Sequence, residues 1–227
     1  MTADLKTTIK ENINAVHQAI EAMCSHAGVA KANPKLIAVS KVQPKARVIA
    51  ALESGQRIFG ENKLQEAEDR WTELRAQFSD IELHLIGGLQ SNKVAKAVAL
   101  FDVIQTVDRI KIAEKLTAEM EKQSRHLPVF LQVNTGREAQ KGGCMPEDLP
   151  ALVKASAALN LNVVGLMCIP PAADDPALHF ALLKKFAARH HFVRLSMGMS
   201  SDFALAAAMG ATDIRVGTAI FGERDYS

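Results

Sequence analysis

The stretch Leu36-Ile37-Ala38-Val39-Ser40-Lys41 has the composition of a buried strand that ends abruptly in a lysine. Pro44 and a helical pattern follow, so the ammonium group would stand at the edge of a sheet, partly removed from water. Partial desolvation lowers the pKa of a lysine and frees its lone pair for attack on a carbonyl. Lys41 is therefore a candidate for Schiff-base formation. A solvated lysine that merely ends a strand is the alternative, and from this stretch alone it is the more common case.

Seven further segments have the same apolar character, and each is followed by a helical pattern. Including the first, the predicted strands are 36–41, 57–60, 81–86, 103–107, 128–134, 163–169, 192–195 and 214–217. Strands that alternate with helices through short connections predict a parallel sheet. Eight such units are the number that closes a (β/α)8 TIM barrel, which typically has about 250 residues. An open, doubly wound sheet is the alternative, but it more often has fewer strands.

The segment 4–26 precedes the first strand and has apolar residues at steps of three and four, the spacing of an amphipathic helix. These residues are Leu5, Ile9, Ile13, Val16, Ile20 and Met23. We expect this extra N-terminal helix to pack against the outside or the bottom of the barrel. No linker or low-complexity segment interrupts the chain, which predicts a single domain over residues 1–227.

Helix starts can also be predicted from local chemistry. Ser91 and Asp108 stand where a side-chain oxygen could cap the helix that follows. Pro146 stands where a first-turn proline could open the helix after strand five, and Asp174 and Asp175 precede the helix after strand six.

The composition excludes several classes of protein. The net charge of +2 is small, and no basic run with interleaved aromatic residues suggests nucleic-acid binding. Three widely spaced cysteines form neither a disulfide framework nor a metal-binding pattern, so no metal is expected. No apolar run reaches the ~18 residues of a membrane span, and the N-terminus lacks a signal-peptide core. We expect a cytoplasmic monomer that binds neither nucleic acid nor membrane.

The active site of a barrel lies at the C-terminal ends of its strands, and a phosphate is often bound by the loops after strands seven and eight. Lys41 lies at such an end and has the same parity as Ile37 and Val39, so it is expected to point inward with them. Segments 198–202 and 217–222 each combine glycine with a hydroxyl residue at the start of a predicted helix. A lysine beside a phosphate site suits pyridoxal 5′-phosphate (PLP) or a sugar-phosphate aldolase intermediate. Ordinary helix capping is the alternative for either loop alone.

Seven motifs run through the chain in order: Val39-Ser40-Lys41, Phe59-Gly60-Glu61-Asn62, His84-Leu85-Ile86-Gly87, Leu89-Gln90-Ser91-Asn92-Lys93, Gly165-Leu166-Met167, Leu195-Ser196-Met197-Gly198-Met199-Ser200 and Arg215-Val216-Gly217-Thr218-Ala219-Ile220-Phe221-Gly222. Together they resemble the pyridoxal phosphate homeostasis protein family, from Lys35 to Tyr226. The resemblance implies a barrel like the N-terminal domain of alanine racemase, with PLP held as an internal aldimine on Lys41.

The same resemblance implies further roles at the cofactor site. Ser200, Gly217 and Thr218 would hold the phosphate, Arg215 would face the pyridine nitrogen, and Asn62 would lie near the ring. Family members are understood as carriers or regulators of vitamin B6 supply, with no established catalytic reaction and with PLP-dependent apoenzymes as conceivable partners. The chain departs from the common family pattern at Val42-Gln43, at Gly88 and at Ser201, which concerns ring-side detail and loop conformation.

A PLP-dependent amino-acid racemase of low activity is the main alternative. Racemisation requires a base on each face of the substrate carbanion, and Lys41 could serve only one face. The single tyrosine, Tyr226, follows the last helical stretch, and His84 in the third strand reads as a core histidine rather than a second base. Arginine keeps its proton, so Arg215 leaves a pyridine nitrogen unprotonated and the ring a poorer electron sink. We therefore expect no catalytic residues and favour a carrier.

Overall fold

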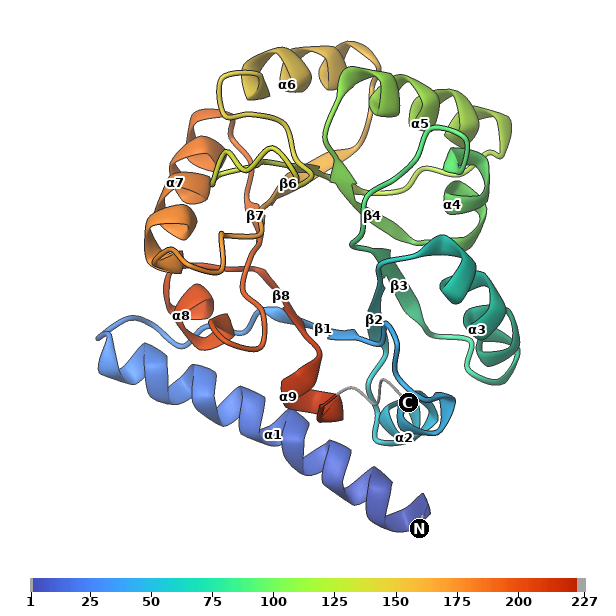
Figure 1. Ribbon diagram of the computed structural model, residues 1–227, viewed down its shortest axis with the longest axis vertical. Coiled ribbons are helices and arrows are strands. Elements are labelled where there is room, and N and C mark those ends of the chain that lie inside the picture. The colour runs from blue at the N-terminus through green and yellow to red at the C-terminus, as the bar shows by residue number, and fades with distance from the viewer. Residues whose placement is uncertain (1, 224–227) are drawn as a thin grey trace.

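The computed structural model describes residues 2–223 as a closed barrel of eight parallel strands with helices around it (Figure 1). The strands follow one another in sequence order, and β8 closes the ring beside β1, where Ile37 lies opposite Arg215. The predicted (β/α)8 TIM barrel is confirmed. Tyr226, which the sequence singles out as the only tyrosine, lies outside the described residues.

The strands have the bounds β1 Lys35–Val39, β2 Ile58–Glu61, β3 Glu82–Leu85, β4 Val103–Val107, β5 Val129–Gln132, β6 Val163–Met167, β7 Arg194–Ser196 and β8 Asp213–Val216. The helices have the bounds α1 Thr2–His26, α2 Lys45–Glu53, α3 Leu64–Gln77, α4 Val94–Leu100, α5 Ile110–Lys122, α6 Leu149–Ala158, α7 Pro176–Arg189, α8 Phe203–Ala208 and α9 Thr218–Phe221. Every predicted strand is present, most of them one to three residues shorter than expected.

The extra N-terminal helix lies outside the ring, where α1 packs against α2, α8 and α9 (Figure 1). Its buried face includes Ile9, Val16 and Ile20, as the apolar spacing predicts. Asn12 donates a hydrogen bond from Nδ2 to the carbonyl of Ile220, 2.8 Å away. This helix therefore supports α9, the short helix that follows β8.

The two faces of the sheet bury different side chains. Outward-facing residues such as Leu83 and Ile104 join the main apolar core between strands and helices. A separate small cluster consists of Val103, Phe130 and Met167, one residue each from β4, β5 and β6. Side chains alternate between the two faces of a strand, and these three point into the barrel. Ile37 also lies inside, opposite Arg215, and polar side chains fill much of the remaining interior, with His84, Gln105, Ser196 and Arg215 all buried. So many polar side chains are unusual, because branched apolar residues generally fill such barrels.

Three of the predicted helix starts are wrong. Helix α4 begins after Lys93 rather than after a cap at Ser91, and α5 begins after Arg109. Asp108 does not cap α5, because its carboxylate instead pairs with the guanidinium of Arg109. Helix α6 begins at Leu149, three residues after Pro146. By contrast, the Asp175 carboxylate accepts the Ala177 N–H and caps α7 as expected.

All three cysteines are buried and free, as their spacing predicts. Burial raises the pKa of the Cys144 and Cys168 thiols to about 12, so they are inert as nucleophiles. Between residues 2 and 223, no group of His, Cys, Asp and Glu side chains is arranged to hold a metal ion. Within the same range, no helix has both the length and the apolarity needed to cross a bilayer.

Candidate cofactor site

A cavity of about 280 Å³ lies at the C-terminal ends of the strands. The six residues predicted as site residues all line it: Lys41, Asn62, Ser200, Arg215, Gly217 and Thr218. They come from the ends of β1, β2, β7 and β8, so the fold brings together positions up to 177 residues apart in sequence. Five other residues line the cavity that were not predicted individually as site residues, namely Val39, Ile86, Ile169, Met199 and Ser201.

The missed residues are mostly apolar and supply walls rather than charges. Ile86 follows β3 and Ile169 follows β6, so both stand at strand ends like the predicted residues. Their position after a strand was the available signal, but an isoleucine at the end of a strand is ordinary in a buried sheet. Their apolar surface suits the faces of a planar ring.

Lys41 lies in a tight turn directly after β1. The Ser40 N–H still donates to the carbonyl of Gly60, 3.1 Å away, so pairing with β2 continues up to the lysine. The Gln43 N–H then donates to the Ser40 carbonyl at 3.1 Å, which closes the turn around Lys41 and Val42. The lysine is half-buried and reaches the cavity, as its parity with Val39 predicts.

A buried ion pair fixes this turn from behind. The Glu61 carboxylate is fully buried, and its Oε1 accepts hydrogen bonds from Ser40 Oγ at 2.7 Å, Arg70 Nη1 at 2.6 Å and Trp71 Nε1 at 3.0 Å. Arg70 also donates to two carbonyls of the turn, Ser40 at 2.8 Å and Gln43 at 2.9 Å. Arg70 of helix α3 therefore holds the backbone on both sides of Lys41 through hydrogen bonds from one guanidinium.

The turn contains a strained residue next to the lysine. Val42 has φ 60°, the left-handed region, which a β-branched residue adopts at a cost of about 1–2 kcal/mol. Its side chain is exposed, so no packing gain offsets that cost. Strain of this kind persists where the surrounding structure determines the backbone, here through Arg70.

We predict that Val42→Asn raises the free energy of unfolding by about 1 kcal/mol, because asparagine tolerates the left-handed region. Urea unfolding followed by circular dichroism measures the change. Val193→Asn is the matched control, since Val193 is also exposed but does not have a positive φ. Equal effects of the two substitutions would show that backbone strain at Val42 contributes nothing to stability.

The two loops after β7 and β8 meet at Ser200. Its Oγ accepts the backbone N–H of Gly217 at 3.2 Å and that of Ala219 at 3.4 Å, both at the start of α9. Gly198 has φ 95°, a conformation that favours glycine, and a Cβ there would lie 2.6 Å from the Cβ of Ala206. The loops thus present hydroxyl groups and backbone N–H donors to the cavity, which is the chemistry of a phosphate site.

Arg215 points from β8 into the floor of the cavity and is only 3% exposed. Its Nη1 donates to Ser196 Oγ at 2.5 Å and its Nη2 donates to the Cys168 carbonyl at 2.8 Å. Burial lowers the pKa of the guanidinium from its usual value. Guanidinium still keeps its proton near neutral pH, so Arg215 is a fixed donor with no capacity to accept.

The lining has a clear charge preference. Lys41 and Arg215 are cationic, and none of the residues that line the cavity is acidic. The arrangement offers an amine at one end, hydroxyl and N–H donors at another, a donor-only cation below and apolar walls between them. It can therefore hold a small, flat anion that carries a carbonyl group within reach of Lys41.

Comparisons with known proteins agree with this geometry. The family model described as the alanine racemase N-terminal domain matches residues 6–225. The pyridoxal phosphate homeostasis protein of Pseudomonas aeruginosa is 45% identical over 228 residues, which cover 97% of each chain. The protein of that name from Escherichia coli K12 is 36% identical over 96% of this chain and 98% of its own.

Solved structures give the same result. PipY of Synechococcus elongatus without PLP matches with a TM-score of 0.85 and 38% identity, over 94% of this chain and 100% of PipY. PipY with PLP bound matches with a TM-score of 0.74 and 37% identity, over 90% and 100% of the two chains. Alanine racemase of Bartonella henselae, at 16% identity and a TM-score of 0.73, shares the fold over 96% of this chain and 59% of the racemase. The chain therefore belongs to the pyridoxal phosphate homeostasis protein family.

Proposed function

We propose that this chain binds PLP as an imine on Lys41 and acts in PLP homeostasis as a carrier or regulator, without a catalytic reaction of its own. One observation carries the proposal: a single cavity collects Lys41, Arg215 and the phosphate-type loops, and none of its lining residues is acidic. The bound cofactor of PipY, a relative at 37% identity, supports the same assignment.

The lining residues fit the chemical groups of PLP. The N–H groups of Gly217 and Ala219 converge on one oxygen, Ser200 Oγ, and a phosphate oxygen bound there would take the place of that oxygen or accept its proton. Lys41 supplies the amine that a 4′-aldehyde requires, and the proposed imine links the two with loss of water. Arg215 supplies an N–H to the pyridine nitrogen and cannot protonate it. Asn62 contributes an amide beside the ring.

Within residues 2–223, the residues that line the cavity support a PLP carrier rather than a racemase, because they offer no second acid or base beside Lys41. PLP, when bound, stabilises a carbanion, and racemisation then needs a base on either face. The described residues that line the cavity include no histidine, no tyrosine and no carboxylate. His84 does not line the cavity. Its ring lies inside the barrel, where its two nitrogens contact Glu82 and Gln105.

In this proposal the protein works as a cytoplasmic monomer that releases PLP to PLP-dependent apoenzymes. An imine would suit that role, since exchange with a second amine would move the cofactor onto that amine and return Lys41 as a free amine, without oxidation or reduction.

Titration of the cofactor-free protein with PLP, followed by absorbance, tests the proposal. We expect saturable binding with an imine band, and binding of pyridoxal at least about a hundredfold weaker, or about 2.8 kcal/mol, because it lacks the phosphate. Incubation of the loaded protein with L-alanine should yield no D-alanine. Equal affinity for pyridoxal would contradict the phosphate site, and steady D-alanine production would favour the racemase.

A further inference from the structure

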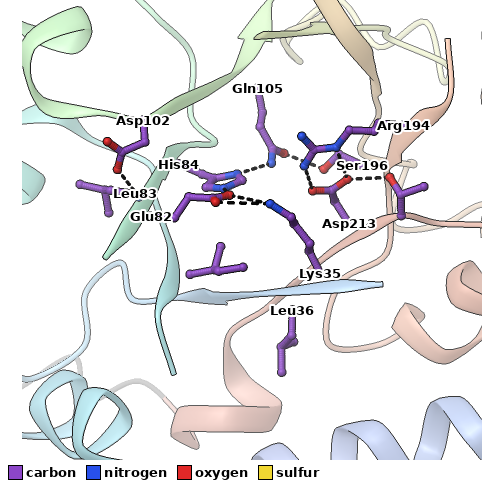
Figure 2. Close-up of polar contacts among 12 residues, drawn as sticks. Lys35, Leu36, Glu82, Leu83, His84, Asp102, Gln105, Arg194, Ser196 and Asp213 are labelled. Carbon is purple, nitrogen blue, oxygen red and sulfur yellow. Dashed lines mark hydrogen bonds and ion pairs between the residues drawn. The ribbon is translucent and has the colours of Figure 1, made fainter. Parts of the chain in front are cut away.

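A chain of hydrogen bonds crosses the barrel interior from Arg215 to the opposite mouth. Arg215 Nη1 contacts Ser196 Oγ at 2.5 Å, Ser196 Oγ contacts Gln105 Oε1 at 2.6 Å, and Gln105 Nε2 contacts His84 Nδ1 at 2.8 Å. His84 Nε2 then contacts Glu82 Oε1 at 2.7 Å. Figure 2 shows the members from Ser196 to Glu82 lying one after another inside the barrel, with the ammonium of Lys35 beside Glu82.

The two ends of this chain determine the direction of every bond in it. His84 and Lys35 lower the pKa of the Glu82 carboxyl to about 2, so Glu82 is ionised and can only accept. His84 must therefore donate from Nε2. The amide nitrogen of Gln105 can only donate, so Nδ1 is the acceptor in its 2.8 Å contact with Gln105 Nε2. The Gln105 oxygen accepts the Ser196 hydroxyl proton, which leaves the lone pairs of Ser196 for Arg215. No member has a donor facing a donor.

This alignment compensates an unusual charge. Arg215 is buried, and no carboxylate between residues 2 and 223 forms an ion pair with it. The nearby Asp213 is engaged by Arg194 and by the Thr212 hydroxyl. A buried cation without a counter-ion is costly unless dipoles are aimed at it. In the chain each acceptor end faces Arg215 and each donor end faces Glu82, so the aligned groups polarise one another and stabilise both ends.

We propose that Ser196, Gln105 and His84 are positioning residues for Arg215, and that Glu82 is the anionic end that sets the direction of their hydrogen bonds. This series of hydrogen bonds holds the guanidinium plane against the cofactor cavity and fixes the His84 ring with Nε2–H toward Glu82 and Nδ1 toward Gln105. The role of these hydrogen bonds toward a ligand rests on the proposed function, because Arg215 is the member that lines the cavity. The hydrogen bonds themselves can be tested without a ligand.

The same end of the barrel offers a contrast. The Arg194 guanidinium pairs with Asp213 and lies 4.8 Å from the centre of the Phe130 ring. Figure 2 shows Arg194 and Asp213 as well, and neither of them forms a hydrogen bond with Arg215 among the contacts of the described residues. The positioning role therefore falls on the group of Ser196, Gln105 and His84 and not on the Arg194–Asp213 pair.

Nuclear magnetic resonance of the cofactor-free protein, labelled with ¹⁵N at histidine and arginine, tests the chain directly. At pH 8 we expect the His84 ring to carry its proton on Nε2 and to accept a hydrogen bond at Nδ1. We also expect slowly exchanging Nη protons on Arg215 that Gln105→Met and Ser196→Ala make fast. A proton on Nδ1, or Nη exchange unchanged in both variants, would overturn the proposal whatever the ligand is.

Binding of PLP to the same variants tests the role toward the cavity. Gln105→Met and Ser196→Ala should each weaken binding about tenfold, or about 1.4 kcal/mol, and shift the absorption band of the bound cofactor. Gln132→Met is the matched control, since Gln132 is also a buried barrel glutamine but donates to the Gly142 carbonyl. The control should stay within about twofold of the unmodified protein, or about 0.4 kcal/mol.

The outcomes separate this proposal from the function. If the unmodified protein binds PLP and Gln105→Met matches it in affinity and spectrum, the chain does not position Arg215 for the ligand and the function stands. If the unmodified protein binds no PLP, the proposed function fails. The resonance experiment alone then tests whether the hydrogen bonds from Glu82 to Arg215 exist as proposed.

Discussion

Lys41→Ala is expected to remove the imine absorption band completely while leaving weak PLP binding. The imine requires a primary amine in the cavity, and Lys41 is the only lysine among the described residues that line it. Ser200, Gly217 and Thr218 remain, so phosphate contacts persist. We expect the affinity to fall at least about a hundredfold, or about 2.8 kcal/mol. Absorbance and equilibrium dialysis measure the two effects separately.

Lys45→Ala is the matched control for this variant. Lys45 begins α2, four residues after Lys41, but its exposed ammonium pairs with Glu73 outside the cavity. The control should keep both the band and the affinity of the unmodified protein. A persisting imine band in Lys41→Ala would show that another lysine carries the cofactor.

Arg70→Met is expected to lower the free energy of unfolding by about 3–5 kcal/mol, the largest stability effect we predict. The substitution leaves the Glu61 carboxylate fully buried without its cationic partner. It also removes the donors to the carbonyls of Ser40 and Gln43 that hold the Lys41 turn. Chemical denaturation measures the loss, and weaker imine formation should accompany it.

Two comparisons make the Arg70 prediction specific. Arg137→Met breaks an exposed pair with Glu147 and should change stability by no more than about 0.5 kcal/mol. The double variant Glu61→Leu with Arg70→Met removes both charges and should recover part of the loss, since the penalty comes from an unpaired charge. A double variant less stable than Arg70→Met would contradict this explanation.

The barrel could be predicted because its signals are local. Apolar runs of strand length, each followed by a helical pattern, occur eight times, and period-two alternation carries Lys41 to the inside with Ile37 and Val39. Lys41 and the loops 198–202 and 217–222 could be predicted to line a cavity because barrels place their sites at strand ends, whereas Asn62 and Arg215 were predicted only from the family resemblance. Helix starts at Ser91 and Asp108 could not, because Asp108 pairs with Arg109 instead of capping.

The supporting contacts could not be predicted, for a physical reason. Arg70 gives no signal of its own on α3, and its partners Ser40 and Glu61 become neighbours only when β1, β2 and α3 pack together. Ser196 and Gln105 are 91 residues apart in sequence. A buried glutamine in a strand signals that some partner exists, but only the closed barrel identifies it.

Reduction of the PLP-loaded protein with borohydride, followed by peptide mass analysis, tests the central claim most directly. Borohydride converts an imine into a stable amine, so the reduced cofactor stays on the lysine that held it. The account predicts loss of the imine band and a single adduct on the peptide that contains Lys41. An adduct on a different lysine, or no adduct on a protein that binds PLP, would contradict it.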